Sequence, residues 1–244
     1  MAQVVIVTGG AGGIGAAICR GLAHDGMKVV VADFAEEAGK SLAEEIKRAG
    51  GDALFEKVDV GDKASVSRMV EGALARCSQI DFLINGAGVM SRMPVENMPE
   101  EEWDRIMRIN LKGTFLCSQA VARPMIQRKS GRIICVASGR GVAGQPRAAH
   151  YAASKAGVIA FVKSLAMELA PRNVTVNAIA PGATDTPMSR AGVSSEEEWQ
   201  KRAAVPPLMG GLTTKEEIVG LIRYLLSEPA KNLTGQTFLL RTPR

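Results

Sequence analysis

The chain contains few of the residues that hold metals or form disulfide frameworks. Its 244 residues include four cysteines and two histidines. The cysteines, at positions 19, 77, 117 and 135, lie far apart, and no Cys-x-x-Cys pair occurs. Metal sites and disulfide scaffolds both require these residue types at close, recurring spacings. We therefore expect neither a metal site nor a disulfide framework.

Long apolar runs and aromatic residues are also scarce. No run approaches the roughly 18 apolar residues of a membrane span, and the first apolar run begins at Val4 without a basic leader. This pattern predicts a cytoplasmic protein without a membrane partner. Aromatic residues make up 4% of the chain, and the net charge of +5 comes from basic residues dispersed among acids. That distribution indicates solvated surface and predicts no nucleic-acid partner.

Short apolar runs rich in β-branched residues alternate with helix-length segments along the chain. Strands are expected at residues 4–8, 28–33, 53–58, 82–85, 132–137, 174–179 and 236–240. Helices are expected up to residue 23 and over residues 36–49, 151–170 and 215–226. Such alternation favours right-handed βαβ units. It predicts an α/β fold in a single domain over residues 1–244, with a doubly wound parallel sheet of about seven strands and helices on both faces.

A glycine-rich stretch, TGGAGGIG at residues 8–15, stands between the first expected strand and the helix after it. Glycines there permit positive φ angles and let the backbone approach a pyrophosphate, which the helix N-terminus stabilises. This is the context that a dinucleotide-binding loop requires. Two glycine registers fit such a loop, Gly10-x-Gly12-x-x-Gly15 and Gly9-x-x-x-Gly13-x-Gly15.

Asp33 ends the second expected strand, 18 residues after Gly15. At about that spacing a carboxylate accepts hydrogen bonds from the adenosine ribose hydroxyls, and its charge repels a 2′-phosphate. The glycine loop contains no Lys or Arg, and Arg20 lies more than a turn into the helix. The cofactor is therefore predicted to be NAD rather than NADP. The alternative is that Asp33 is a turn residue that caps the next helix.

Tyr151 and Lys155, in the stretch HYAASKAG, lie four positions apart in a segment of helical pattern. On a helix such residues share one face, so the Lys155 ammonium can sit beside the phenol. A neighbouring cation favours the phenolate and lowers the pKa of a tyrosine from its ordinary value of about 10. The pair is either an acid/base device or two ordinary residues of a helix surface.

The order and spacing of these motifs resemble those of the short-chain dehydrogenase/reductase family, from Val4 to about Leu240. The closest pattern is that of NAD-dependent members similar to 3-oxoacyl-acyl-carrier-protein reductases. TGGAGGIG matches the family's Thr-Gly-x-x-x-Gly-x-Gly loop, which selects the second glycine register. The resemblance implies a Rossmann fold. The residues that match the family's catalytic tetrad, in which the serine stands 13 positions before the tyrosine, are Asn110, Ser138, Tyr151 and Lys155.

The resemblance also implies where the cofactor binds. Asp59 and Val60 look like the family's adenine contact, and PGATDT at residues 181–186 looks like its nicotinamide carboxamide turn. NGAG at residues 85–88 resembles the Asn-Asn-Ala-Gly turn, with Gly86 in place of the second asparagine. The expected cofactor-binding residues are Gly9, Gly13, Ile14, Gly15, Asp33, Asp59, Val60, Asn85, Gly88, Tyr151, Lys155, Pro181, Gly182 and Thr186.

The function implied is the interconversion of a secondary alcohol and a ketone with NAD(H). Tyr151 would act as the general acid/base, and Lys155 would lower its pKa and hold the nicotinamide ribose. Ser138 would donate a hydrogen bond to the substrate oxygen, and Asn110 would keep a water-linked proton path. His150 is expected on the surface or at the pocket rim.

Two other functions remain open at this point. The stretch GQPRAAHYAASKAG resembles 3-oxoacyl-[acyl-carrier-protein] reductases, and Lys129 and Arg172 would then form a basic site for the acyl-carrier protein. Asp33 counts against this alternative, because that branch commonly uses NADPH. The remaining alternative is a nucleotide-sensing or structural protein without turnover.

A homo-oligomer, either a tetramer or a dimer, is implied by the resemblance, through the 151–170 helix and the helix after Asn110. A substrate lid is expected at residues 188–212, which carry mixed polarity and paired prolines. The substrate itself is a small-molecule alcohol or ketone. Four arginines in segments that could border the site hint at an anionic substrate, namely Arg92, Arg140, Arg147 and Arg190.

Overall fold

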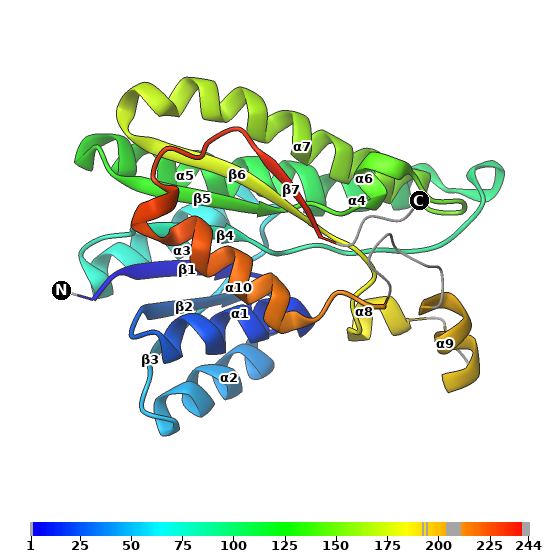
Figure 1. The fold of residues 1–244 in the computed structure, drawn as a ribbon, viewed down its shortest axis with the longest axis horizontal. Helices are drawn as coiled ribbons and strands as arrows, with labels where there is room; N and C mark the ends of the chain where they lie inside the picture. Colours follow the sequence, from blue (N-terminus) through cyan, green and yellow to red (C-terminus); the bar gives the residue numbers. More distant parts are fainter. Residues whose placement is uncertain (1, 192, 194, 204–210, 241–244) are drawn as a thin grey trace.

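A computed structural model of the chain, which describes residues 2–191, 193, 195–203 and 211–240, contains a parallel sheet of seven strands (Figure 1). The strand order is β3-β2-β1-β4-β5-β6-β7, and every neighbouring pair is parallel. The strands are β1 (Val4–Thr8), β2 (Lys28–Asp33), β3 (Asp52–Lys57), β4 (Phe82–Asn85), β5 (Gly131–Val136), β6 (Val174–Pro181) and β7 (Thr237–Leu240).

Helices cover both faces of this sheet (Figure 1). The α-helices are α1 (Gly13–His24), α2 (Glu36–Arg48), α3 (Lys63–Cys77), α4 (Glu100–Met107), α5 (Gly113–Arg128), α6 (Arg140–Ala143), α7 (Ala149–Leu169), α8 (Pro187–Arg190), α9 (Glu196–Ala203) and α10 (Lys215–Leu226). Shorter turns are the 3₁₀ segments η1 (Val95–Asn97), η3 (Ala170–Arg172) and η4 (Glu228–Ala230) and the π-helical η2 (Arg108–Lys112).

Two hydrophobic cores, one on each face, hold the helices to the sheet. Val5 and Val7 of β1 pack into the core under α1, α2 and α10, whereas Val4 and Ile6 pack into the core under α3, α5 and α7. Successive strand side chains point to opposite faces, so a strand covered on both sides reads as a continuous apolar run. All five residues of β1 are buried, and each of its four apolar side chains contributes about 1.5–3 kcal/mol of burial free energy.

The strand order reverses between β1 and β4, which are neighbours in the centre of the sheet. In sheets of this kind ligands bind in the crevice beyond the carboxyl ends of the strands at such a switch point. The predicted α/β fold and doubly wound sheet are thus confirmed, and observed strand ends differ from the predicted ones by no more than two residues. The helix that carries Tyr151 begins at Ala149, two residues earlier than predicted.

The described residues contain no helix that is both long and apolar enough to cross a bilayer. Within the same part of the chain, no cluster of three or more His, Cys, Asp or Glu side chains is placed to hold a metal ion. All four cysteines are free thiols, and Cys19, Cys117 and Cys135 are buried. Their burial raises the thiol pKa values, that of Cys135 to about 11, so these thiols stay protonated at neutral pH.

Candidate active site

The glycine loop after β1 is packed too tightly for side chains. Gly9 has a φ angle of +66°, and a Cβ there would lie 2.7 Å from the Ala87 Cα atom. A Cβ on Gly15 would lie 2.0 Å from the Gly9 carbonyl oxygen, and one on Gly13 would lie 3.0 Å from Thr186. At Gly12 the nearest atom would be 3.5 Å away, an ordinary contact. A Cβ on Gly10 would lie 2.8 Å from the Val7 carbonyl oxygen, so Gly9, Gly10 and Gly15 are required by close backbone contacts, Gly13 is tight, and Gly12 is the open position of the first register.

The N-terminus of α1 faces a cavity of about 700 Å³ at the carboxyl ends of the strands. Its N-cap residue, Gly12, supplies no side-chain hydrogen bond to the first turn, and Gly12, Gly13 and Ile14 all line the cavity. Uncapped N–H groups at a helix N-terminus form an anion site. The residues present therefore fit the pyrophosphate of a dinucleotide.

Asp33 lines the same cavity from the end of β2. Its two carboxylate oxygens accept hydrogen bonds from the backbone N–H groups of Ala11 and Ala35, each at 2.9 Å. The carboxylate thereby ties the glycine loop to the start of α2 and keeps lone pairs free for a sugar hydroxyl. Arg20 is engaged elsewhere, since its Nε lies 2.7 Å from Glu45 Oε1.

Asp59 and Asn85, two of the predicted cofactor residues, have protein partners. The Asp59 carboxylate pairs with the Arg108 guanidinium at 3.0 Å, and both residues line the cavity together with Val60. Asn85 does not line the cavity. Its Nδ2 donates to Ser118 Oγ at 2.9 Å and to Cys135 Sγ at 3.4 Å, so the side chain supports the cavity floor rather than facing a ligand.

The turn after Asn85 forms one wall of the cavity, through Gly86, Ala87 and Gly88. The Thr8 hydroxyl accepts hydrogen bonds from the N–H groups of Gly86 at 3.2 Å and Ala87 at 3.3 Å, which fastens the turn to β1. A Cβ on Gly86 would lie 2.8 Å from the Thr8 carbonyl oxygen. The glycine that replaces the family's second asparagine is therefore required by this close approach.

Asn110 lies in the π-helical turn η2 and is fully buried. Its Oδ1 accepts from the Val89 N–H at 2.8 Å, and its Nδ2 donates to the Val89 carbonyl at 3.0 Å and to Ser154 Oγ at 3.1 Å. The Ser154 hydroxyl donates to the Tyr151 carbonyl at 2.8 Å. Turns of this type often mark functional sites. Here the turn lets one side chain join the cavity wall to α7 beside Tyr151.

Ser138, Tyr151 and Lys155 meet at the cavity wall, where each is less than a tenth exposed. The Lys155 ammonium lies 5.9 Å from the centre of the Tyr151 ring and donates to the Val136 carbonyl at 2.7 Å. Burial lowers the pKa of Lys155 to about 8, so its ammonium is still mostly charged at neutral pH. The i, i+4 placement on α7 therefore brings the Lys155 ammonium beside the Tyr151 ring, as the sequence predicts.

The pKa of Tyr151 is shifted upward, not downward as the sequence predicts. Burial is the largest cause, and a hydrogen bond from Ser138 and the charge of Arg140 oppose it. Burial disfavours the phenolate because the charge loses its hydration. The protein alone thus keeps the phenol protonated, and the cation that opposes this most directly is the Arg140 guanidinium.

The predicted carboxamide turn follows β6, and Pro181, Gly182 and Thr186 all line the cavity. Thr186 is the N-cap of α8, where its hydroxyl accepts from the Ser189 N–H at 3.2 Å. The capping box fixes the loop directly above Gly13, whose missing side chain leaves the necessary room. Loops from β1 and β6, distant in sequence, therefore close over one cavity.

The site thus combines a glycine loop before the uncapped helix α1 with a buried Ser-Tyr-Lys set, and proteins of similar sequence are known. Residues 3–197 match the family model described as short chain dehydrogenase. The chain belongs to the short-chain dehydrogenase family. As a member of that family it is an oxidoreductase that uses a nicotinamide cofactor.

The short-chain dehydrogenase is similar over almost its whole length to relatives that are named either as reductases or as dehydrogenases. It is 41% identical over 240 residues to the 3-oxoacyl-[acyl-carrier-protein] reductase of Synechocystis sp., covering 97% of this chain and 94% of that protein. It is 37% identical over 238 residues to the cyclopentanol dehydrogenase of Comamonas sp., covering 98% and 95%. The crystal structure of gox2181 superposes with a TM-score of 0.93 at 33% identity, covering 98% and 94%.

His150 of this short-chain dehydrogenase is not at the surface or the rim as predicted, because its side chain is fully buried. Its Nε2 lies 2.8 Å from Ser91 Oγ, and the Ser91 hydroxyl donates to Glu102. Glu102 is held in turn by Arg105, at 2.7 and 2.8 Å. The chain of bonds anchors the loop after β4 to α4 and to the start of α7. Sequence reasoning missed it because its members come from three separate segments.

Acidification is expected to weaken the fold through His150. Burial, the largest cause, and Arg105 lower the pKa of His150, against the opposing charge of Glu102. The unfolded chain then binds this proton below about pH 6.5 while the folded chain resists it, so stability is complete above that pH and lost as the pH falls below it. Chemical denaturation at pH 7.5 and 5.5 measures the loss, which for one such group is at most about 1.4 kcal/mol per pH unit below the unfolded pKa.

Two variants separate His150 from the rest of the chain. In His150→Gln this part of the pH dependence should vanish, whereas the exposed His24 offers a matched control, His24→Gln, which should retain it. An unchanged pH dependence in His150→Gln would show that the buried cluster does not titrate in this range. The Glu102 carboxylate, whose pKa Arg105 lowers to about 2, stays charged throughout the measurement.

Proposed function

We propose that this short-chain dehydrogenase interconverts a secondary alcohol and a ketone with NAD(H), with Tyr151 as the general acid/base. The observation that carries the proposal is the meeting of Ser138, Tyr151 and Lys155 in one cavity with the glycine loop. Ser138 follows β5, Tyr151 and Lys155 lie on α7, and the glycine loop follows β1, so three separate segments of the chain bring these groups together. The whole chain, residues 1–244, would act as one catalytic domain.

In the oxidation direction the Tyr151 oxygen would accept the proton of the substrate hydroxyl, and in the reduction direction it would return that proton. Ser138, whose hydroxyl opposes the raised pKa of the Tyr151 phenol, would donate to the substrate oxygen as charge develops. The Lys155 amine, held by the Val136 carbonyl, would favour the phenolate that oxidation needs wherever the amine is protonated, and it would hold the nicotinamide ribose. When bound, the nicotinamide ring supplies the hydride acceptor or donor.

The remaining predicted residues would hold the cofactor. Gly9, Gly13, Ile14 and Gly15 would receive the pyrophosphate at the start of α1, and Asp33 the adenosine ribose. The other groups proposed to contact it all line the cavity, and they are Asp59, Val60, Gly88, Pro181, Gly182 and Thr186. Asn85, which is also predicted to bind the cofactor, does not line the cavity and is hydrogen-bonded to Ser118 instead. Asn110 would act as a positioning residue, through Val89 and Ser154.

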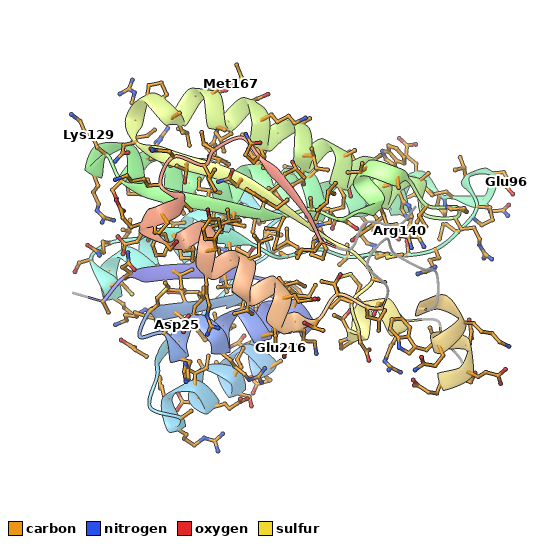
Figure 2. All side chains as sticks on the ribbon, viewed as in Figure 1. Asp25, Glu96, Lys129, Arg140, Met167 and Glu216 are labelled. Atoms are coloured by element: carbon orange, nitrogen blue, oxygen red, sulfur yellow. The ribbon has the colours of Figure 1, made fainter. Side chains whose placement is uncertain are left out.

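A second candidate, a 3-oxoacyl-[acyl-carrier-protein] reductase, is favoured by the relative of that name at 41% identity. Lys129 follows α5 and Arg172 ends η3, where β5 and β6 begin. Figure 2 shows Lys129 at the end of the molecule opposite to Arg140. A carrier protein docked on this pair would therefore lie a full strand length from the cavity of the same subunit, about 20 Å for six residues.

The experiment follows the absorbance of reduced nicotinamide with NAD⁺ and NADP⁺ in turn. The substrates would be secondary alcohols, including cyclopentanol, and 3-hydroxyacyl thioesters. Turnover of simple alcohols with NAD⁺ supports the proposal. Turnover confined to thioesters and NADP(H) supports the second candidate. NADH binding without turnover of either class would favour a nucleotide-sensing role.

A homo-oligomer, a tetramer or a dimer, would cover exposed aromatic residues on α4, α5 and α7. Phe115, which is 40% exposed, packs edge-to-face on Phe161 with ring centres 6.2 Å apart, and Trp103 is 39% exposed. Phe161→Glu should lower the mass measured by light scattering after size exclusion, whereas Val95→Glu, at a 66% exposed residue of η1, should not. An unchanged mass in both variants would place the interface elsewhere.

The proposed substrate lid, residues 188–212, lies partly outside the described residues, which here are 188–191, 193, 195–203, 211 and 212. In the described part, the Arg190 guanidinium pairs with Asp185 at 2.5 Å and Glu196 at 2.7 Å and stacks on the Trp199 ring at 4.9 Å. These contacts tie α8 to α9. Met188 and Trp199 line the cavity, so the pair of helices forms part of its wall.

A further inference from the structure

The four arginines that could border the site differ in their surroundings. Arg190 is neutralised by Asp185 and Glu196. Arg147 is exposed and does not line the cavity. Arg92 and Arg140 do line it, from the loop after β4 and from the first residue of α6. Of the four arginines that the sequence suggests for an anionic substrate, Arg92 and Arg140 are therefore the two that line the cavity.

Arg140 is the one closest in sequence to the reacting groups. Its backbone N–H donates to Ser138 Oγ at 3.2 Å, and its guanidinium charge acts on the Tyr151 phenol. Figure 2 shows Arg140 at the same end of the molecule at which Figure 1 shows α8 and α9. Among the residues that the structure describes, no carboxylate lies within ion-pair distance of its guanidinium, which is only partly exposed. A partly desolvated cation of this kind is stabilised by an anionic partner.

The acids of the cavity lie at its other end. Within the described chain its lining contains two carboxylates, Asp33 after β2 and Asp59 after β3. Since β2 is three strand positions from β5, Asp33 is separated from Ser138 by about 14 Å at 4.7–4.9 Å per strand. That exceeds the screening length of about 8 Å at physiological salt. Asp59 is paired with Arg108, so neither acid compensates Arg140.

The lining of the cavity that contains Arg140 is polar at Arg92, Ser138 and Gln145 and apolar at several other positions. Val89, Met90, Met188 and Trp199 supply part of this apolar surface. A guanidinium in such surroundings presents its N–H groups as a planar fork that matches a carboxylate in bidentate fashion. Low local polarity strengthens that interaction relative to one in water.

We propose that Arg140 binds an anionic group of the substrate, which is thus a short hydroxy acid in one direction and the matching oxo acid in the other. The proposal rests on the proposed function. Because Arg140 is two residues from Ser138, the anionic group lies only a few bonds from the carbon that is oxidised or reduced. A carboxylate suits the fork best, and a sulfonate or phosphate offers the same chemistry.

The test measures kcat/KM with NAD⁺ for 2-, 3- and 4-hydroxypentanoate and for their methyl esters. The wild type should favour an acid over its ester. In Arg140→Gln the acid-to-ester ratio should fall about 10- to 100-fold, the value of a charge-assisted hydrogen bond, and Arg140→Lys should restore part of it. Arg147→Gln is the matched control and should leave the ratio unchanged. The sulfonate and phosphate analogues of the best acid identify which anion is preferred.

Each outcome separates this proposal from the proposed function. Turnover of esters as efficient as that of acids, or a ratio that Arg140→Gln leaves intact, overturns the anion site and leaves alcohol oxidation standing. If none of these acids and esters is turned over, the alcohol panel described above still tests the proposed function, and binding tests the anion site. A saturable rise in the Tm of the protein with NAD⁺ on adding 4-oxopentanoate, lost in Arg140→Gln, then supports the site, and an equal rise in both proteins overturns it.

Discussion

Tyr151→Phe should lower kcat for alcohol oxidation by about 10²- to 10⁴-fold, the contribution typical of a positioned acid/base. The substitution removes the phenolic oxygen and keeps the ring, which is buried against α7 and the cavity. The packing loss is therefore small, and the effect should appear in kcat more than in cofactor binding. Steady-state rates, together with NADH titration of both proteins, make the distinction.

The pH dependence of the wild type provides a second signature of the same group. Oxidation needs the phenolate, whereas reduction needs the protonated phenol, so the oxidation rate should rise with pH where the reduction rate falls. Burial raises the pKa of Tyr151, which places this change in the alkaline range. Arg140→Gln should move it to still higher pH, because the guanidinium charge that opposes the raised pKa of Tyr151 is removed. Equal rates for Tyr151→Phe and the wild type at every pH would remove Tyr151 from the mechanism.

Asp33→Asn should reduce the preference for NAD⁺ over NADP⁺ by about 100-fold or more. A fixed carboxylate beside a 2′-phosphate costs several kcal/mol through like-charge repulsion, and the same group loses a charge-assisted bond to the ribose when it becomes an amide. Asparagine keeps one oxygen for the N–H of Ala11 or Ala35. The folded state should survive, which circular dichroism can verify.

Equilibrium titration with NAD⁺, NADP⁺ and their reduced forms measures this preference without requiring a substrate. Glu37→Gln is the matched control, because Glu37 is on α2 with a 93% exposed side chain and does not line the cavity. It should leave the ratio of the two Kd values unchanged. A wild-type protein that binds NADP⁺ as tightly as NAD⁺ would contradict the role assigned to Asp33.

The features that the sequence predicts well are those set by local spacing. The strand before the glycine loop and the i, i+4 pair on α7 follow from neighbouring residues, and both occur where expected. Asp33 falls at the end of β2 for the same reason. A period of two or of 3.6 residues is a property of a short segment, so it can be read without knowing the rest of the chain.

The features that sequence reasoning missed depend on contacts between distant segments. His150 is buried because Ser91 and Glu102, 59 and 48 positions away, fold against it. Asn85 is turned to its partners by the register of β4, which pairs it with Thr8 on one side and Cys135 on the other. The π-helical turn at Asn110 has no sequence pattern of its own, since it requires only one additional residue per turn.

The order of the strands separates the residue proposed to select the cofactor from the residue proposed to select the substrate. Asp33 belongs to the half of the sheet formed by β1, β2 and β3, and Arg140 follows β5 in the other half, three strands away. Substitutions separated by more than about 7–10 Å without shared partners usually have additive free energies. Cofactor preference and substrate preference can therefore be altered separately, and improved in turn by protein engineering, without one change undoing the other.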